Sequence, residues 1–150
     1  MGDLNKTEVV LYINDLVDGK IHQLQLRFDD LNKDLSSEHK SSAGDKHETS
    51  RAMTQLEQEK LSTQLSQFGI QKEIISKLNL SKSDKVQLGS IVKTTQGVFF
   101  ISIGLGKIEI NNNDVYCISA SSPIGQLLLN LEVGKSYTFN GKTNTIVEIL

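Results

Sequence analysis

The fold of this chain is decided by residues 7–35, which read TEVVLYINDLVDGKIHQLQLRFDDLNKDL. Apolar side chains recur there every three or four residues, at Val10, Ile13, Val17, Ile21, Leu24, Phe28, Leu31 and Leu35. This spacing predicts a helix that packs along one narrow stripe. A helix over 7–40 would be about 50 Å long at 1.5 Å per residue. That is too long for a compact domain of this size, so we expect the helix to project.

A second helical pattern follows the first. Its apolar positions are less regular and fall at Met53, Leu56, Leu61, Leu65, Phe68, Ile74, Ile75 and Leu78. An isolated helix of this kind has little reason to persist, whereas two antiparallel helices can bury each other's stripes. We therefore predict an antiparallel coiled-coil hairpin over residues 5–78, within a first domain spanning 1–79. An intermolecular coiled coil is the alternative, but the polar break at 36–52 favours a chain that folds back on itself.

The apolar period drops to two beyond a polar connector at 79–85. Short segments rich in Val, Ile, Phe and Tyr predict strands at 90–94, 98–103, 107–110, 114–119, 135–139 and 145–149. Asn140-Gly141 is a strong signal for a two-residue hairpin turn. Ser122 as N-cap and Pro123 at the first helical position predict one short helix. The predicted fold class is therefore α+β, with a helical hairpin followed by a small antiparallel sheet domain over 86–150.

Composition narrows the possible functions. The formal charge of the 150 residues is -2, so the chain lacks the basic surface that autonomous binding to duplex DNA or RNA requires. Cys117 is the single cysteine, which excludes an internal disulfide framework. Its strand-like neighbours predict a core residue and not a nucleophile. No segment has the apolar length of a signal peptide or a membrane span, so we expect a soluble, cytoplasmic protein.

Two carboxylates stand at the predicted bend of the hairpin, Asp45 and Glu48. Their spacing allows a capping box, with Asp45 as N-cap and Glu48 at the third helical position, which needs no ligand. The other interpretation is metal-related. Mg²⁺ is commonly held by one or two carboxylates together with phosphate oxygens and waters. The pair would bind Mg²⁺ poorly alone, but beside a phosphodiester and a resident metal it could complete a two-metal site.

Other candidate sites in the sequence are weaker. His39 and His47 flank the bend, where we expect solvated side chains and no dedicated transition-metal site. His22 lies next to the stripe residue Ile21 and is expected on the hairpin surface. Residues 104–106 read Gly-Leu-Gly, which lacks the third glycine and the strand–helix context of dinucleotide binding.

Three stretches together match the pattern of a known family. Ser122-Pro123-Ile124-Gly125 precedes the short helix, and Val133-Gly134-Lys135 follows it. The segment 86–92 (VQLGSIV) enters the same domain, and Gly44-Asp45-x-x-Glu48 stands at the bend. In order and separation, over nearly the whole chain, these parts resemble the bacterial Gre family (GreA/GreB) of transcript-cleavage and transcription elongation factors.

The resemblance implies an accessory factor of bacterial RNA polymerase, and not an enzyme. An FKBP-like C-terminal domain would dock at the rim of the polymerase secondary channel through Ser122, Pro123, Ile124 and Gly125. The hairpin would reach the polymerase active site, where Asp45 and Glu48 would help to hold a second Mg²⁺ and position a water that hydrolyses backtracked RNA. The Mg²⁺ would be supplied in the polymerase active site, next to the 3′ end of the nascent RNA. We further expect a monomer without membrane contact.

The tip departs from the family pattern at two positions. Thr49 stands where the family has asparagine, and Arg51 replaces an aromatic residue. Two functions therefore stay open, stimulation of RNA cleavage and a non-catalytic Gre-like regulator or inhibitor that occupies the same channel. A third interpretation, an unrelated coiled-coil adaptor, predicts no polymerase binding at all.

Overall fold

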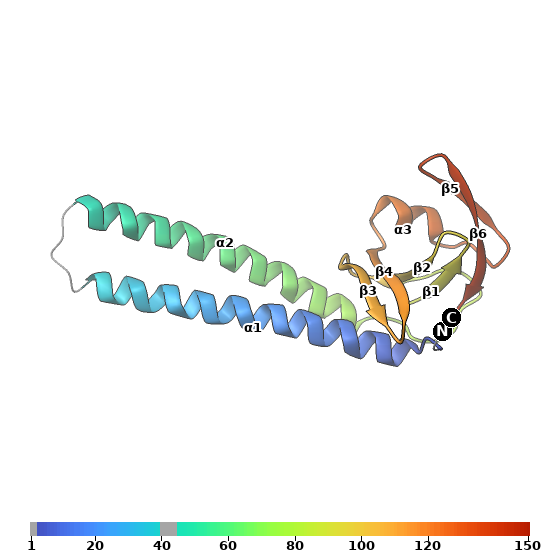
Figure 1. The fold of residues 1–150 in the computed structure, drawn as a ribbon, viewed down its shortest axis with the longest axis horizontal. Helices are drawn as coiled ribbons and strands as arrows, with labels where there is room; N and C mark the ends of the chain where they lie inside the picture. Colours follow the sequence, from blue (N-terminus) through green and yellow to red (C-terminus); the bar gives the residue numbers. More distant parts are fainter. Residues whose placement is uncertain (1–2, 40–44) are drawn as a thin grey trace. The chain divides into compact units, whose positions relative to one another are not determined.

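The structure, a computed structural model, describes residues 3–39 and 45–150, without the side chains of 36–39 and 45–47. Two long helices come first, α1 (Lys6–His39) and α2 (Asp45–Ser76). Six strands and one short helix follow (Figure 1): β1 (Ile91–Thr94), β2 (Val98–Ser102), β3 (Gly106–Ile110), β4 (Asn113–Ser119), α3 (Pro123–Leu128), β5 (Ser136–Phe139) and β6 (Lys142–Ile149). This confirms the predicted α+β fold. Among the described residues, none of the helices combines the length and hydropathy needed to cross a lipid bilayer.

The chain forms two compact units. One unit comprises Asn14–Lys72, which is most of the helical pair. The other comprises Met1–Ile13 together with Glu73–Leu150. It therefore contains the first turns of α1 and the last turn of α2 as well as the sheet. Each unit is described by itself below.

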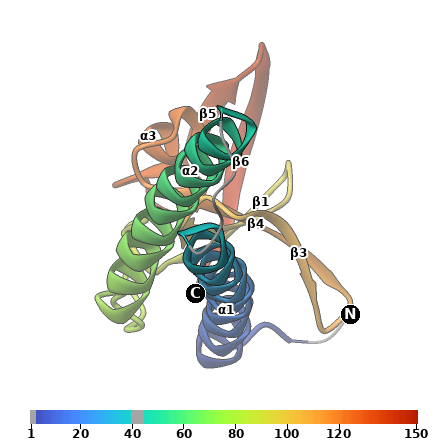
Figure 2. The ribbon, with the colours of Figure 1, turned by 90° about the vertical axis from the view of Figure 1, so that its left-hand side faces the viewer.

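Within the helical unit, α1 and α2 run antiparallel, and the side and end views show the two helices next to each other (Figures 1 and 2). Val17 and Leu31 on α1 and Leu61 on α2 are buried. The other predicted stripe residues of α1 between Val17 and Leu35 are half-buried. The apolar stripe of α1 is thus confirmed, and it continues along most of the described helix.

The stripe of α2 differs from the prediction near the start of this helix. Met53 and Leu56 are 66% and 65% exposed, so neither packs against α1. Arg51, Thr54, Glu57 and Gln58 are the half-buried residues there, and the amide of Gln58 donates to Asn32 on α1. The prediction was wrong because it followed apolar residues, whereas positions 54, 58 and 61, spaced by four and three, form the face toward α1.

At the opposite end of α2, polar contacts again join the two helices. The ammonium of Lys72 lies 2.8 Å from the carboxylate of Asp18 and also donates to the side chain of Asn14. Along the same helix pair, Lys20 lies 5.6 Å above the ring of Phe68. The helical unit therefore alternates apolar and polar contacts along its length.

The sheet of the second unit has the strand order β3-β4-β2-β1-β6-β5. All neighbouring pairs are antiparallel except β2 and β4, which run parallel with Phe100 opposite Cys117. This parallel pair requires a crossover, which β3 provides before it pairs back onto β4. Asn140 and Gly141 join β5 to β6 with φ of 52° and 78°, the positive values of the predicted two-residue turn.

The core of this unit lies where α3 packs on the sheet. Ile124 and Leu128 of α3 join buried residues of the sheet and its flanking segment, namely Val86, Val92, Phe99, Ile101, Tyr137, Ile146 and Ile149. The first turn of α1 belongs to the same unit, where Asn111 donates to the carboxylate of Glu8 at 3.0 Å. Val9 is fully buried and Val10 only partly, which corrects the predicted start of the stripe by one residue.

Candidate functional site

The acidic pair at the hairpin end falls at the start of α2. Asp45 is the first residue of this helix, and Glu48 lies in its first turn with an exposed side chain. The side chain of Asp45, like the bend at 40–44, lies outside the described residues. The capping-box interpretation of this pair therefore stays a prediction.

Glu48 has the surroundings of a carboxylate that is open to a ligand. Among the described residues it has no hydrogen-bond or ion-pair partner, so its oxygens can accept from outside the chain. The start of a long helix carries a partial positive charge that favours negative groups. This arrangement places an exposed carboxyl group at the first turn of α2.

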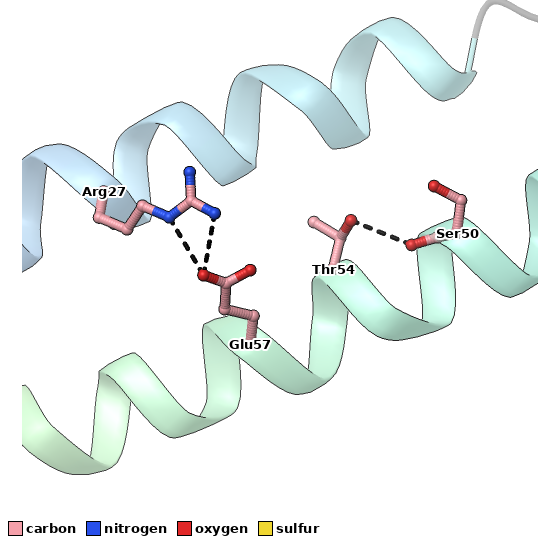
Figure 3. Close-up of polar contacts among 4 residues, drawn as sticks. All are labelled: Arg27, Ser50, Thr54 and Glu57. Atoms are coloured by element: carbon pink, nitrogen blue, oxygen red, sulfur yellow. Dashed lines mark hydrogen bonds and ion pairs between the residues drawn. The ribbon is translucent and has the colours of Figure 1, made fainter.

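Two polar contacts lie in this region, one between the helices and one within α2. Arg27 on α1 binds one carboxylate oxygen of Glu57 on α2, with Nη2 at 2.9 Å and Nε at 3.1 Å (Figure 3). One turn closer to the start of α2, the hydroxyl of Thr54 donates to the main-chain carbonyl of Ser50 at 3.0 Å. Among the residues whose side chains are described, no buried apolar residue lies closer to this end of the hairpin than Leu31 on α1 and Leu61 on α2.

The described residues contain no group of three histidine, cysteine or acidic side chains that could hold a metal ion. Asp45, His39 and His47 fall outside this statement, because their side chains are not described. Cys117 is buried, as predicted. Burial raises the pKa of its thiol to about 12, although a hydrogen bond with Ser102 lowers it in part. A neutral, enclosed thiol is a core residue and no nucleophile.

The second candidate region is the loop that opens α3. Ser122 is the N-cap of this helix, as predicted, and its hydroxyl accepts from the main-chain nitrogen of Gly125 at 3.1 Å. The same hydroxyl donates to the carbonyl of Ser119 at 2.7 Å. Pro123 occupies the first helical turn, where its missing N–H costs nothing. The Ser122 hydroxyl thus connects the end of β4 to the first turn of α3.

The four predicted docking residues differ in exposure. Pro123 is exposed and Ser122 half-buried, whereas Ile124 and Gly125 are buried. A Cβ on Gly125 would lie 2.3 Å from the carbonyl oxygen of Ser119, so the position requires glycine. Ile124 and Gly125 therefore hold the loop in place, and Pro123 is the member that a partner can reach.

Sequence reasoning missed two exposed apolar residues of the same unit. Leu127 lies four residues after Pro123, on the same face of α3, and is 40% exposed. Tyr116 on β4 is also 40% exposed, and its ring packs against Phe99 with 5.8 Å between centroids. The alternation of β4 could have identified Tyr116, because Val115 and Cys117 are the inward residues.

The comparisons with known proteins gave distant similarities only. No family model and no curated protein sequence matches the chain. Among solved structures, the chain is similar to the transcription factor Gfh1, with 17% identity and a TM-score of 0.35 over 91% of this chain and 92% of that one. GreA factor homolog 1 (Gfh1) of Thermus thermophilus has 16% identity and a TM-score of 0.36, over 91% and 94%. Gfh1 of Thermus aquaticus has 19% identity and a TM-score of 0.33, over 90% and 92%. Likenesses at this level assign neither a family nor a function, so the proposal below rests on the chain's own residues.

Proposed function

We propose that this chain is a Gre-like transcription factor that binds bacterial RNA polymerase through its secondary channel and stimulates Mg²⁺-dependent cleavage of backtracked RNA. The observation that carries the proposal is Glu48 in the first turn of α2, which is exposed and has no partner among the described residues. This helix belongs to an antiparallel hairpin of two helices with 34 and 32 residues. A carboxylate placed there adds nothing to a core and is open to a visiting molecule.

The chemistry of the acidic pair fits Mg²⁺. Carboxylate oxygens are the ligands that Mg²⁺ prefers, and one or two of them suffice when phosphate oxygens and waters complete the shell. Asp45 and Glu48 would supply these oxygens beside the polymerase's own metal site. When bound there, Mg²⁺ polarises a phosphoryl oxygen and lowers the pKa of a bound water. The chain's own contribution is to deliver the two carboxylates and to orient the attacking water.

The loop at Ser122 would provide the attachment to polymerase. Its rigid hydrogen bonds present Pro123 to solvent, with Leu127 one turn further on the same face of α3. Pro123 and Leu127 are both apolar and exposed, and hydrogen bonds already order the loop before any partner binds. Binding would therefore cost little conformational entropy, which favours the use of these residues as a docking surface. We expect the protein to act in the cytoplasm as a monomeric accessory factor, with the polymerase and the 3′ end of the nascent RNA as partners.

Cleavage of a backtracked elongation complex tests this function. The complex is assembled with the cognate polymerase and Mg²⁺, and the 3′ RNA fragments are followed over time. Asp45→Asn/Glu48→Gln should release fragments much more slowly than the wild-type chain. The matched control is Asp30→Asn/Asp34→Asn, which neutralises two exposed acids of α1 and should cleave as the wild type does. Equal rates for the wild type and the Asp45/Glu48 variant would falsify the catalytic role.

The second candidate is a non-catalytic regulator that occupies the same channel. It is favoured by two departures from the Gre pattern: Thr49 replaces the asparagine directly after the second acid, and Arg51 replaces the aromatic residue three positions beyond that acid. This candidate predicts polymerase binding without RNA cleavage. A pull-down with core polymerase, comparing wild type with Pro123→Ser, separates it from an unrelated adaptor. An adaptor binds no polymerase, whereas both Gre-like candidates bind and lose affinity when Pro123 is replaced.

A further inference from the structure

Glycine occurs at one level of both long helices. Gly19 lies in the interior of α1, where Lys20 follows it, and Gly69 lies in the interior of α2, where Phe68 precedes it. The two glycines are at the same level of the antiparallel pair, because the ammonium of Lys20 lies 5.6 Å from the centroid of the Phe68 ring. Both glycines are exposed. At this level, each helix therefore carries the residue that is the weakest helix former after proline.

Packing does not require glycine at either position. A Cβ on Gly19 or on Gly69 would have no atom within 4 Å. Alanine would therefore fit both positions, and in a helix interior it is favoured over glycine about fivefold. Glycine also leaves the main chain more conformations than any other residue does. The two helices should therefore bend more easily at this level than elsewhere in the described part of the helical unit.

One buried polar atom close to Gly69 lacks a partner. Oε1 of Gln71, on the next turn of α2, is buried, and no group of the described residues donates to it. A buried acceptor without a donor disfavours the conformation that contains it, and such an atom in a folded protein needs an explanation. A shift of α2 that lets water reach Gln71 would supply the donor. This conformation therefore carries a local cost at the level where glycine permits another one.

The contacts of the helical unit change at the same level. On one side, Val17 is fully buried, and Lys72 forms an ion pair with Asp18 at 2.8 Å. On the other side lies a cavity of about 210 Å³. It is lined by residues of both helices, namely Lys20, Gln23, Leu24, Gln64 and Phe68. Side chains that border open space can shift with fewer clashes than those in a close-packed core, so the packing permits a bend between the two sides.

We propose that Gly19 and Gly69 form a flexible joint, at which the part of the hairpin nearer the start of α2 bends relative to the part that Asp18 and Lys72 hold together. Glu48 lies about 30 Å from Gly69 along α2 at 1.5 Å per residue. A bend of about 20° at the joint would therefore move Glu48 by about 10 Å. This inference goes beyond the proposed function, because bending is a property of the free chain and is measured without polymerase or RNA.

Residual dipolar couplings of the ¹⁵N-labelled full chain in a weakly aligning medium test for bending. In the wild type, residues 21–35 of α1 should require an alignment tensor that differs in size or orientation from that of residues 9–18, on the other side of Gly19. Gly19→Ala/Gly69→Ala should bring the two tensors together, because each alanine lowers the population of the bent helix about fivefold. Residues 49–66 of α2 contain no glycine and are the internal control, for which one tensor is expected throughout.

Hydrogen exchange shows whether the two glycines act together. The hydrogen bonds of the amides at 20–23 and 70–73 span the glycines, because each helical N–H donates to the carbonyl four residues earlier. Since the joint bends as a unit, Gly19→Ala alone should raise protection factors about fivefold on α2 as well as on α1. Thr63→Ala is the matched control, because it raises helix propensity at an exposed position of α2 away from the joint. It should leave protection at 70–73 unchanged.

The proposal is overturned if one alignment tensor fits both segments of α1 in the wild type, or if Gly19→Ala raises protection on α1 alone. The first result would mean that the hairpin is rigid at this level. The second would mean that each glycine loosens only its own helix. Cleavage of backtracked RNA is a separate measurement, so a failure of the proposed function leaves both results on the joint unchanged.

Discussion

Arg27 on α1 and Glu57 on α2 form an ion pair in which two guanidinium nitrogens share one carboxylate oxygen, at 2.9 and 3.1 Å. The side chains are 52% and 42% exposed, so solvent weakens their attraction. Together with the Asn32–Gln58 hydrogen bond, the pair joins the helices where α2 offers no buried apolar residue. This region of the hairpin is therefore held by polar contacts that fix its register.

The first prediction concerns the strength of this ion pair. In a double-mutant cycle with Arg27→Ala and Glu57→Ala, we expect a coupling free energy of about 0.2–1 kcal/mol, as for other exposed pairs. Urea unfolding at low and high salt measures it, and the coupling should shrink at 0.5 M NaCl because exposed charges are screened. A coupling that is unchanged by salt would show that the pair is less exposed to solvent than its surface areas indicate.

The second prediction separates the two kinds of apolar residue on α2. Leu61 is buried, whereas Leu56 is largely exposed. Leu61→Ala should lower the free energy of unfolding by about 2–3 kcal/mol, because it removes buried methyl groups and leaves a cavity. Leu56→Ala should change it by less than about 0.5 kcal/mol, as surface substitutions do. Urea unfolding of both variants decides, and a large loss for Leu56→Ala would contradict the orientation of α2.

The sequence predictions were correct where a feature depends on neighbouring residues alone, and wrong where it depends on packing between distant parts of the chain. Asn140-Gly141 and Ser122-Pro123 act through their own backbone preferences, so the turn and the helix start were predicted at the right residues. The choice between Val9 and Val10 could not be made in the same way. Both residues fit the period of α1 with Ile13, and only the packing of the folded chain decides which one is buried.

Features that join segments distant in the sequence could not be predicted from the sequence pattern. The parallel pairing of β2 with β4 joins strands that are separated by β3, and strand composition does not distinguish it from an antiparallel pair. The cavity lined by Gln96, Phe99, Tyr116, Ile118, Ile124 and Phe139 was missed for the same reason, since its lining comes from five different segments. The acidic pair at the hairpin end was found because its signal is a short motif, but its chemistry remains a prediction.

The third prediction concerns Gly125. A Cβ there would lie 2.3 Å from the carbonyl oxygen of Ser119 and 2.9 Å from the hydroxyl of Ser122. Gly125→Ala should therefore push the loop apart and lower the free energy of unfolding by about 1–3 kcal/mol, the usual effect of overpacking. Gly19→Ala is the control, because no atom lies within 4 Å of its added Cβ. In the interior of α1 it should stabilise the chain by up to about 1 kcal/mol, and calorimetry of the two variants should show shifts of opposite sign.

The fourth prediction concerns the pH dependence that Cys117 gives to stability. Burial raises the pKa of the folded thiol to about 12 from its usual value of 9.0. Above pH 9 the unfolded chain therefore loses this proton while the folded chain keeps it. Because the folded pKa is the higher one, the contribution to stability is complete below pH 9 and is lost as the pH rises toward 12. The loss attributable to Cys117 should approach about 1.4 kcal/mol per pH unit in this window.

Lysines and tyrosines also titrate in the alkaline range, so the effect of Cys117 is measured as a difference. The free energy of unfolding of the wild type and of Cys117→Ala is followed from pH 8 to pH 11, and the gap between the two should narrow or invert as the pH rises. A thiol reagent provides an independent check at pH 8, where Cys117 should be protected in the native chain and react once urea unfolds it. Rapid reaction of the native chain would mean that the thiol is accessible, and the pH dependence expected from its burial would then be absent.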